Sequence, residues 1–196
     1  MAAGKTRGKA SVDAIELLID DHERVKKLFK AFEKAEKSDD MEAMEDIITT
    51  CCAELDVHSK IEKEIFYPAV RAQADEEIEE LLNEADVEHE SVDALVQKLA
   101  TVKLEDEMYK ANFTVVMEYV QHHVKEEEKE MFPKVRKLKG LDLDELATQM
   151  RARQEELMGG YIKEAETADE DMEDEAAIVG EQGGKKSDQR SSRPQR

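Results

Sequence analysis

Apolar residues recur along the middle of the chain at alternating steps of three and four, which is the spacing of one buried helix face. Four long stripes of this kind predict four helices. They run from an N-cap at Ser11 to about Ser38, from the turn at residues 38–40 to Pro68, from about Asp75 to Leu99, and from residues 104–108 to just before Pro133. A shorter stripe predicts a fifth helix from about Asp142 to Met158, ending on Gly159 and Gly160.

Breaks in these stripes are few, because the chain has only 8 glycines and 3 prolines and most glycines lie near its two ends. Short connections make neighbouring helices antiparallel. The predicted fold is all-α: an up-down-up-down antiparallel four-helix bundle over residues 11–158, including a short additional C-terminal helix. Residues 1–10 and the acidic, then polar, residues 159–196 lack periodicity, and we expect them to be disordered tails.

Polar residues occupy positions on the apolar face of each of the four long helices. His22 and His89 stand on the first and third, and the second and fourth each carry a histidine followed one turn later by a glutamate. These two pairs are His58 with Glu62 and His123 with Glu127. Left unpaired in a core, each group would cost about 1 to 3 kcal/mol, so the six must satisfy one another or bind a metal.

An internal repeat makes this pattern specific. A lone His-x-x-x-Glu means little in a chain with 49 acidic residues out of 196. Here, however, both motifs are followed by an aromatic residue and then a proline ten residues after the histidine, at Pro68 and Pro133. A further histidine precedes each motif by 36 and 34 residues. The repeat predicts two helical hairpins that meet around a pseudo-twofold centre.

Four imidazoles and two carboxylates without thiolates suit iron or manganese better than a cysteine-rich structural zinc site. Two metals that share the two carboxylates form the natural arrangement. His122 competes with His123, but the stripe and the distance to the proline both select His123, and His122 is expected beside the core or at the surface. Tyr67, Tyr109 and Tyr119 are close enough in sequence to donate hydrogen bonds to the site, although packing at the core edge is favoured.

Composition limits the partners and the compartment. A formal charge of −20 disfavours binding to nucleic acid or to an anionic membrane. No segment approaches the roughly 20 apolar residues of a membrane span, which predicts a soluble, cytoplasmic protein. Cys51 and Cys52 are adjacent on a helix, where they cannot form a disulfide framework, and we interpret them as small core residues rather than reactive thiols.

The order His22, His58 with Glu62, His89, His123 with Glu127 resembles the haemerythrin-like, HHE cation-binding family over roughly residues 12–135. The resemblance implies a non-haem di-iron centre in which Glu62 and Glu127 bridge the two Fe ions. His22 and His58 would bind one iron, and His89 and His123 the other. The oxygen carriers of the family surround their irons with more histidines, so positions open to exchange are expected here and reversible oxygen carriage is disfavoured.

Three functions remain open at this point. The first is a di-iron protein that binds iron and a small ligand, namely oxygen, nitric oxide or peroxide, in stress response or sensing. The second is a di-iron enzyme with catalase-like peroxide breakdown. The third is a metal-free helical interaction protein in which the buried histidines and glutamates pair only with one another.

Overall fold

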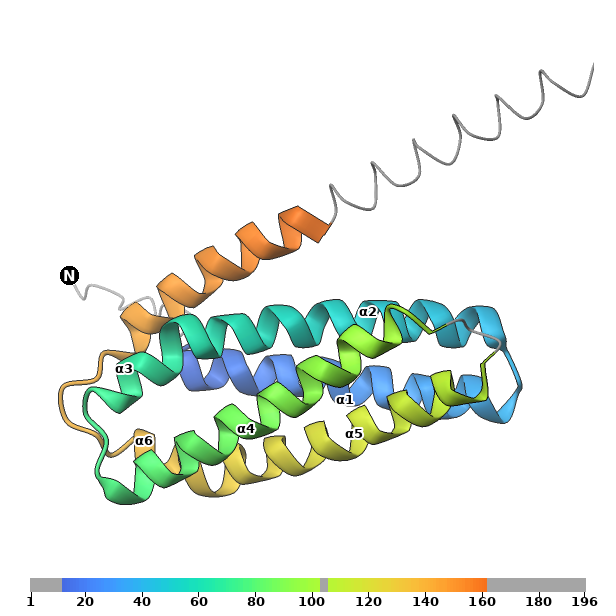
Figure 1. Cartoon of the computed structure of the whole chain (residues 1–196). Coiled ribbons are helices and arrows are strands. Elements are labelled where there is room, and N and C mark those ends of the chain that lie inside the picture. The colour runs from blue at the N-terminus through green and yellow to red at the C-terminus, as the bar shows by residue number, and fades with distance from the viewer. Residues whose placement is uncertain (1–11, 103–105, 162–196) are drawn as a thin grey trace, which may run out of the picture. The chain divides into compact units, whose positions relative to one another are not determined.

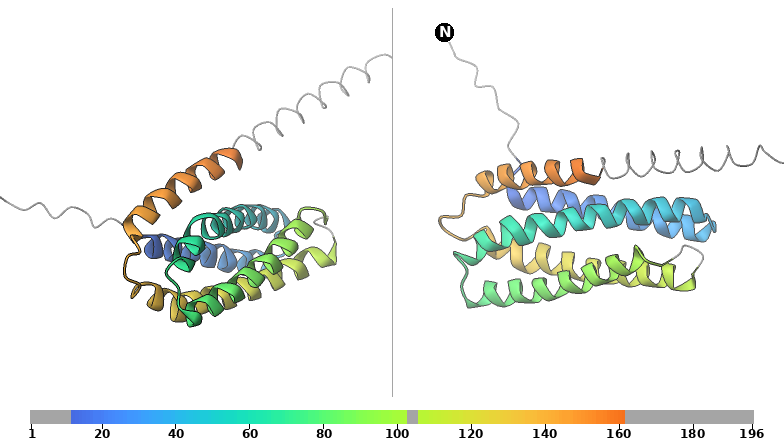
Figure 2. Two further views of the ribbon diagram at one scale, coloured as in Figure 1. Left: turned by 60° about the vertical axis from the view of Figure 1, so that its left-hand side comes forward. Right: turned by 45° about the horizontal axis from the view of Figure 1, so that its top comes forward.

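The computed structural model describes residues 12–102 and 106–161, which are helical apart from short turns and contain no strand (Figure 1). Four long helices form the bundle: α1 (Ala14–Lys37), α2 (Met41–Ile61), α4 (Glu76–Leu99) and α5 (Glu107–Glu126). α1 packs along α2 and α4 packs along α5, so the chain makes two antiparallel hairpins (Figure 2). The predicted all-α four-helix bundle is confirmed. Within the described ranges, no helix is long and apolar enough to cross a membrane.

An aspartate is the N-cap residue of each of the four long helices. The Asp13 side chain accepts a hydrogen bond from the Glu16 amide while the Glu16 side chain accepts one from the Asp13 amide, which completes a capping box. Asp40, Asp75 and Asp106 cap the other three helices. The cap of α1 is therefore Asp13, whereas Ser11, the expected cap, lies outside the described residues.

The expectation that α2 and α5 end at the prolines is wrong. α2 continues through a wide π-helical turn, η1 (Glu62–Phe66), into α3 (Tyr67–Arg71), and α5 continues through η2 (Glu127–Met131) into α6 (Phe132–Val135). A proline is tolerated near the start of a helical segment, where its missing N–H would have no partner. Pro68 and Pro133 occupy this position in α3 and α6. The π turns admit the prolines, and each turn begins on a glutamate of the repeat.

The fifth helix spans residues 143–161 and also differs from expectation at its end. It passes through Gly159 and Gly160 without stopping. Leu146 and Met150 from this helix are buried in the apolar core together with Phe66 and Phe132. The predicted tails were residues 1–10 and 159–196; residues 159–161 are helical, and residues 1–10 and 162–196 lie outside the described residues.

The core consists of two apolar clusters with a polar layer between them. One cluster gathers around the ends of the bundle near α3 and α6, and the other around Phe29, Phe113 and Val116. His22 marks the boundary, since Leu18 belongs to the first cluster and Val25 to the second. The histidines and glutamates of the repeat therefore form the layer that divides the core.

The two cysteines belong to the packing of α2. Both are free, Cys51 is buried and Cys52 is partly buried. Burial raises the pKa of both thiols, to about 11 for Cys52. Since the thiolate is the reactive form, neither cysteine is set up as a nucleophile, in keeping with the sequence interpretation.

Candidate metal centre

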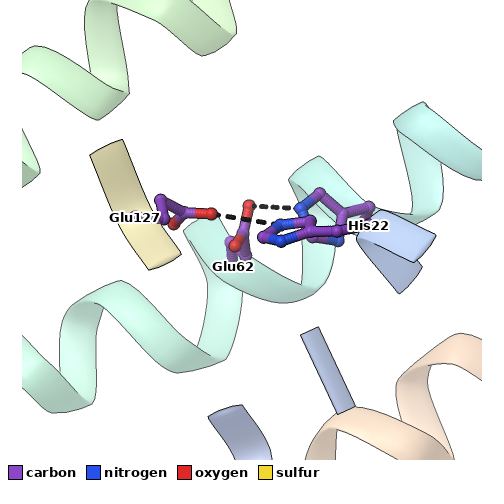
Figure 3. Close-up of side chains that lie close together, drawn as sticks. His22, Glu62 and Glu127 are labelled. Atoms are coloured by element: carbon purple, nitrogen blue, oxygen red, sulfur yellow. Dashed lines mark ion pairs between the residues drawn. The ribbon is translucent and has the colours of Figure 1, made fainter. Parts of the chain in front are cut away.

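All six residues predicted for the metal site meet in the polar layer. His22, His58, His89 and His123 come from α1, α2, α4 and α5, while Glu62 and Glu127 are the first residues of η1 and η2. Each of the six is 6 % exposed or less. Figure 3 shows His22, Glu62 and Glu127 pointing toward one another. The helical repeat thus places two carboxylates among four imidazoles in the interior.

The carboxylate oxygens lie between imidazole rings from different helices. Glu62 Oε2 is 3.2 Å from both His58 Nε2 and His89 Nε2. Glu127 Oε2 is 3.2 Å from His22 Nε2 and 3.4 Å from His123 Nε2. Nitrogen and oxygen atoms at these separations have the spacing of neighbouring ligands around a metal ion.

Among the described residues, three groups of His and Glu side chains bring their possible ligand atoms within 4.8 Å of one another, and two of these groups are buried in the polar layer. The third, Glu88, His122 and Glu126, is partly exposed. Of the two buried groups, one joins His22 and His58 with both glutamates, and the other joins His89 and His123 with Glu62. This is the division of histidines that the family resemblance implied. The role of these atoms as ligands remains a prediction.

Unpaired polar atoms show that the donor set fits a cation. His22 Nε2, His58 Nε2, both oxygens of Glu62 and Glu127 Oε2 are buried without a hydrogen-bond partner. An unpaired buried polar atom costs about 1 to 3 kcal/mol, and five in one place form an unusual concentration. Because they face the same centre, metal ions bound there would satisfy all of them at once.

The outer nitrogen, Nδ1, of each histidine lies near an oxygen, and this contact is a hydrogen bond in His22, His89 and His123 but not in His58. Such an acceptor favours the proton on Nδ1 and leaves the Nε2 lone pair free to bind a metal. The four distances are 3.0 Å from His22 to Glu128, 3.5 Å from His58 to Asp21, 2.8 Å from His89 to Ser59 and 2.7 Å from His123 to Glu88. Glu128, Asp21 and Glu88 are carboxylates among these four neighbours of the rings. The sequence alone did not show which of the many acidic residues would lie next to the histidines.

Without metal, the glutamates and histidines of the centre have pKa values shifted in different directions. Burial and the nearby Glu127 raise the pKa of Glu62 to about 8. Although burial opposes it, the surrounding histidines, His123 first, hold the pKa of Glu127 below its usual range. Burial would also lower the pKa of His22 and His123, but the neighbouring carboxylates, Glu127 first, together outweigh it and raise both pKa values to about 9. Burial and the adjacent His123 lower the pKa of His89 to about 4. Metal binding near neutral pH would therefore displace protons.

Tyr67 belongs to the centre, which the sequence analysis missed by favouring the core edge. Its hydroxyl donates a hydrogen bond of 2.9 Å to Glu127 Oε1 and lies 3.1 Å from His89 Nε2. The repeat carried a signal, because Tyr67 and Phe132 hold equivalent places before the two prolines. Only one half of the pseudo-twofold therefore contributes a hydroxyl, while Phe132 stacks on His22 with ring centroids 5.9 Å apart.

His122 lies away from the centre, as expected. Its side chain is 60 % exposed and pairs with Glu88 and Glu126. The stripe and the proline spacing therefore predicted which of the two adjacent histidines is buried.

A small cavity of about 30 Å³ adjoins the centre. All four histidines line it, but neither bridging candidate does, so it lies on the imidazole side of the cluster. Its apolar walls are Val25, Leu55, Val92, Val120 and Val124. Since one water needs about 10 to 15 Å³ of such space, the cavity has room for roughly two waters or one diatomic molecule.

Comparison with known proteins gives two matches. The family model described as "Hemerythrin HHE cation binding domain" matches residues 13–135, a range that includes all six residues of the centre. A crystal structure of a hemerythrin HHE cation binding domain-containing protein from Mycobacterium kansasii is similar, with a TM-score of 0.66 and 26% sequence identity. That match covers 80% of this chain and 93% of the other. No curated protein matches the chain.

Proposed function

Because the chain belongs to the hemerythrin HHE cation-binding domain family, we propose that its buried His and Glu cluster holds two iron ions and that this pair binds a small ligand. The candidate ligands are oxygen, nitric oxide and peroxide, and the biological setting would be stress response or sensing. Glu62 and Glu127 would bridge the ions. His22 and His58 would hold one ion, and His89 and His123 the other.

The fit of the donor set supports this assignment. Imidazole nitrogens and carboxylate oxygens suit iron, and manganese is the alternative because it takes the same donors. When bound, the iron pair supplies redox chemistry and open coordination positions. The chain supplies the outer contacts of the histidines, which keep Nε2 turned inward, and aliphatic side chains along one cavity beside the centre.

The cavity is the observation that carries the choice of ligand. It adjoins all four histidines, and four valines and a leucine line it beside the polar Asp21, Ser59, Glu88 and Asp93. Its volume of about 30 Å³ has room for about one diatomic molecule. A bulky organic substrate therefore has no place beside the centre. Apolar walls favour ligands such as oxygen and nitric oxide, which carry little or no charge and lose little on leaving water.

Catalase-like peroxide breakdown is the second candidate, and Tyr67 favours it. A buried hydroxyl that touches both Glu127 and His89 can hold or pass a proton at the centre. Turnover separates the two functions. A binding protein would give a stoichiometric spectral change with peroxide, whereas an enzyme would release oxygen over many cycles.

The first test is metal content, by elemental analysis of protein from iron-supplemented cells after loosely bound metal is removed. Wild type, His58→Ala and the surface control His122→Ala are compared. We expect near two irons per chain in wild type and in the control, and less in His58→Ala. Negligible metal in wild type, with an unchanged His58 variant, would instead support the metal-free interaction protein.

A further inference from the structure

The helix of residues 143–161 reaches the metal centre through a buried carboxylate. Gln154 Nε2 donates a hydrogen bond of 2.6 Å to Asp21 Oδ2. Asp21 stands next to His22 on α1 and is only 3 % exposed. The helix that the sequence predicts as a short addition to the four-helix bundle therefore contacts a residue beside the metal-binding candidates.

Asp21 joins three structural elements at its two oxygens. Oδ1 accepts a hydrogen bond of 2.5 Å from Arg24, which also bonds Glu54 on α2. Oδ2 accepts from Gln154 and lies 3.5 Å from His58 Nδ1. Arg24 thus fixes one oxygen, and Gln154 fixes the oxygen that faces the histidine.

The His58 ring differs from the other three metal-centre rings because its outer nitrogen has no hydrogen bond. Its Nδ1 is buried without a hydrogen bond, and Asp21 Oδ2 is the acceptor beside it. When Nε2 binds a metal, Nδ1 must carry the proton, and an acceptor in line with that N–H makes the ring a better and more firmly oriented ligand. The position of Asp21 Oδ2 therefore affects how well His58 Nε2 can bind a metal ion.

We propose that Gln154 is a positioning residue for the metal centre: it holds Asp21 Oδ2 toward His58 Nδ1 and so couples the fifth helix to one of the two metal positions. This inference rests on the proposed metal-binding function. Two other residues of this helix anchor it near Asp21. Arg153 donates hydrogen bonds of 2.8 and 3.2 Å to Glu64 in η1, and Arg151 donates one of 2.7 Å to the Val12 carbonyl.

The proposal predicts an effect on one metal ion rather than both. His58 belongs to the set with His22, whereas His89 and His123 have their own partners on other elements. Loss of the Gln154 amide leaves those partners untouched. A general loosening of the bundle, by contrast, would affect the two ions alike.

The test compares wild type, Gln154→Leu and Gln149→Leu, all loaded with iron and shown to hold two ions per chain. Gln149 lies on the same helix, and among the described residues its side chain bonds only the exposed Glu145, which makes it a matched control. Release of iron to an excess of chelator is followed with time, and Mössbauer spectra report each iron separately. In Gln154→Leu we expect one ion to leave about 10 to 100-fold faster, with a changed spectrum for that iron alone.

Gln154→Glu keeps the side-chain length but replaces the donor with a charge that repels Asp21, and it should accelerate the same ion. The proposal is overturned if release is unchanged in both Gln154 variants, if both ions leave equally faster, or if Gln149→Leu behaves in the same way. Wild type that binds no metal would refute the proposed function instead, so the two failures are distinguishable.

Discussion

Replacing His58 with leucine should change stability in opposite directions with and without metal. In the metal-free protein neither ring nitrogen of His58 has a hydrogen-bond partner, and the residue is 6 % exposed. Leucine fills a similar volume and removes the buried polar atoms. Glu62, its neighbour, keeps its proton below about pH 8, so the substitution leaves no new unpaired charge there. Asp21 keeps its bonds to Arg24 and Gln154.

The magnitudes follow from these contacts. Removing one unpaired buried group gains about 1 to 3 kcal/mol. A gain of about 2 kcal/mol raises the unfolding midpoint by roughly 4 to 8 °C in a domain of this size. With metal the sign reverses, because binding at 100 times Kd stabilises wild type by about 2.7 kcal/mol and the variant loses a ligand.

The assay is thermal unfolding at pH 7, followed by circular dichroism, with the protein either metal-free or equilibrated with ferrous iron without oxygen. His122→Leu is the control, since that histidine is exposed and should leave both midpoints unchanged. If His58→Leu lowers the metal-free midpoint as much as the midpoint with iron, then His58 is an ordinary paired core residue and the reasoning is refuted.

Three further predictions concern the centre. Tyr67→Phe removes the hydroxyl and lowers the free energy of unfolding by about 1 kcal/mol. Any peroxide turnover should fall, while the iron content, measured in parallel, stays near that of wild type. Unchanged turnover would exclude a role of the hydroxyl in proton transfer. Val92→Leu adds a methylene group at the cavity wall, at a steric cost of about 1 to 3 kcal/mol. In a spectral titration, nitric oxide should therefore bind roughly tenfold or more weakly while both irons are retained. An unchanged affinity would mean that the ligand binds elsewhere. In the metal-free protein, protonated His22 and His123 stabilise the fold fully below pH 6.5, and this stabilisation is lost as the pH rises through their raised pKa values of about 9. Glu62, whose pKa is raised to about 8, also makes the folded state less stable as the pH rises, because its buried carboxyl favours the protonated form. The unfolding midpoint of the metal-free protein should therefore fall between pH 6.5 and 9 while metal affinity rises, and a midpoint that climbs over this range would contradict the assignment.

The fold and the six central residues were predictable because both follow from periodicity along single helices. A histidine three or four residues from a leucine stripe must share its face, whatever the partner helix is. The repeat then related His58 with Glu62 to His123 with Glu127. The same logic separated His123 from His122, which the structure places at the surface.

The helix ends were less predictable. Pro68 and Pro133 suggested stops, since proline usually ends a helix. The structure instead absorbs each proline after a π turn that begins on Glu62 or Glu127. An extra residue in the turn is a local choice between two hydrogen-bond patterns, and packing in the core, rather than spacing along the chain, decides it.

The sequence by itself determined which residues face the interior, because the geometry of a helix fixes the angle between positions of known spacing. The tertiary structure alone decided which atoms touch. Asp21 and Gln154 are 133 residues apart, and Tyr67 and Glu127 are 60 apart. Such contacts depend on the distance between helices and on side-chain rotamers, and periodicity carries no information about either. For the same reason, the cavity beside the four histidines appears only when the four helices are packed together.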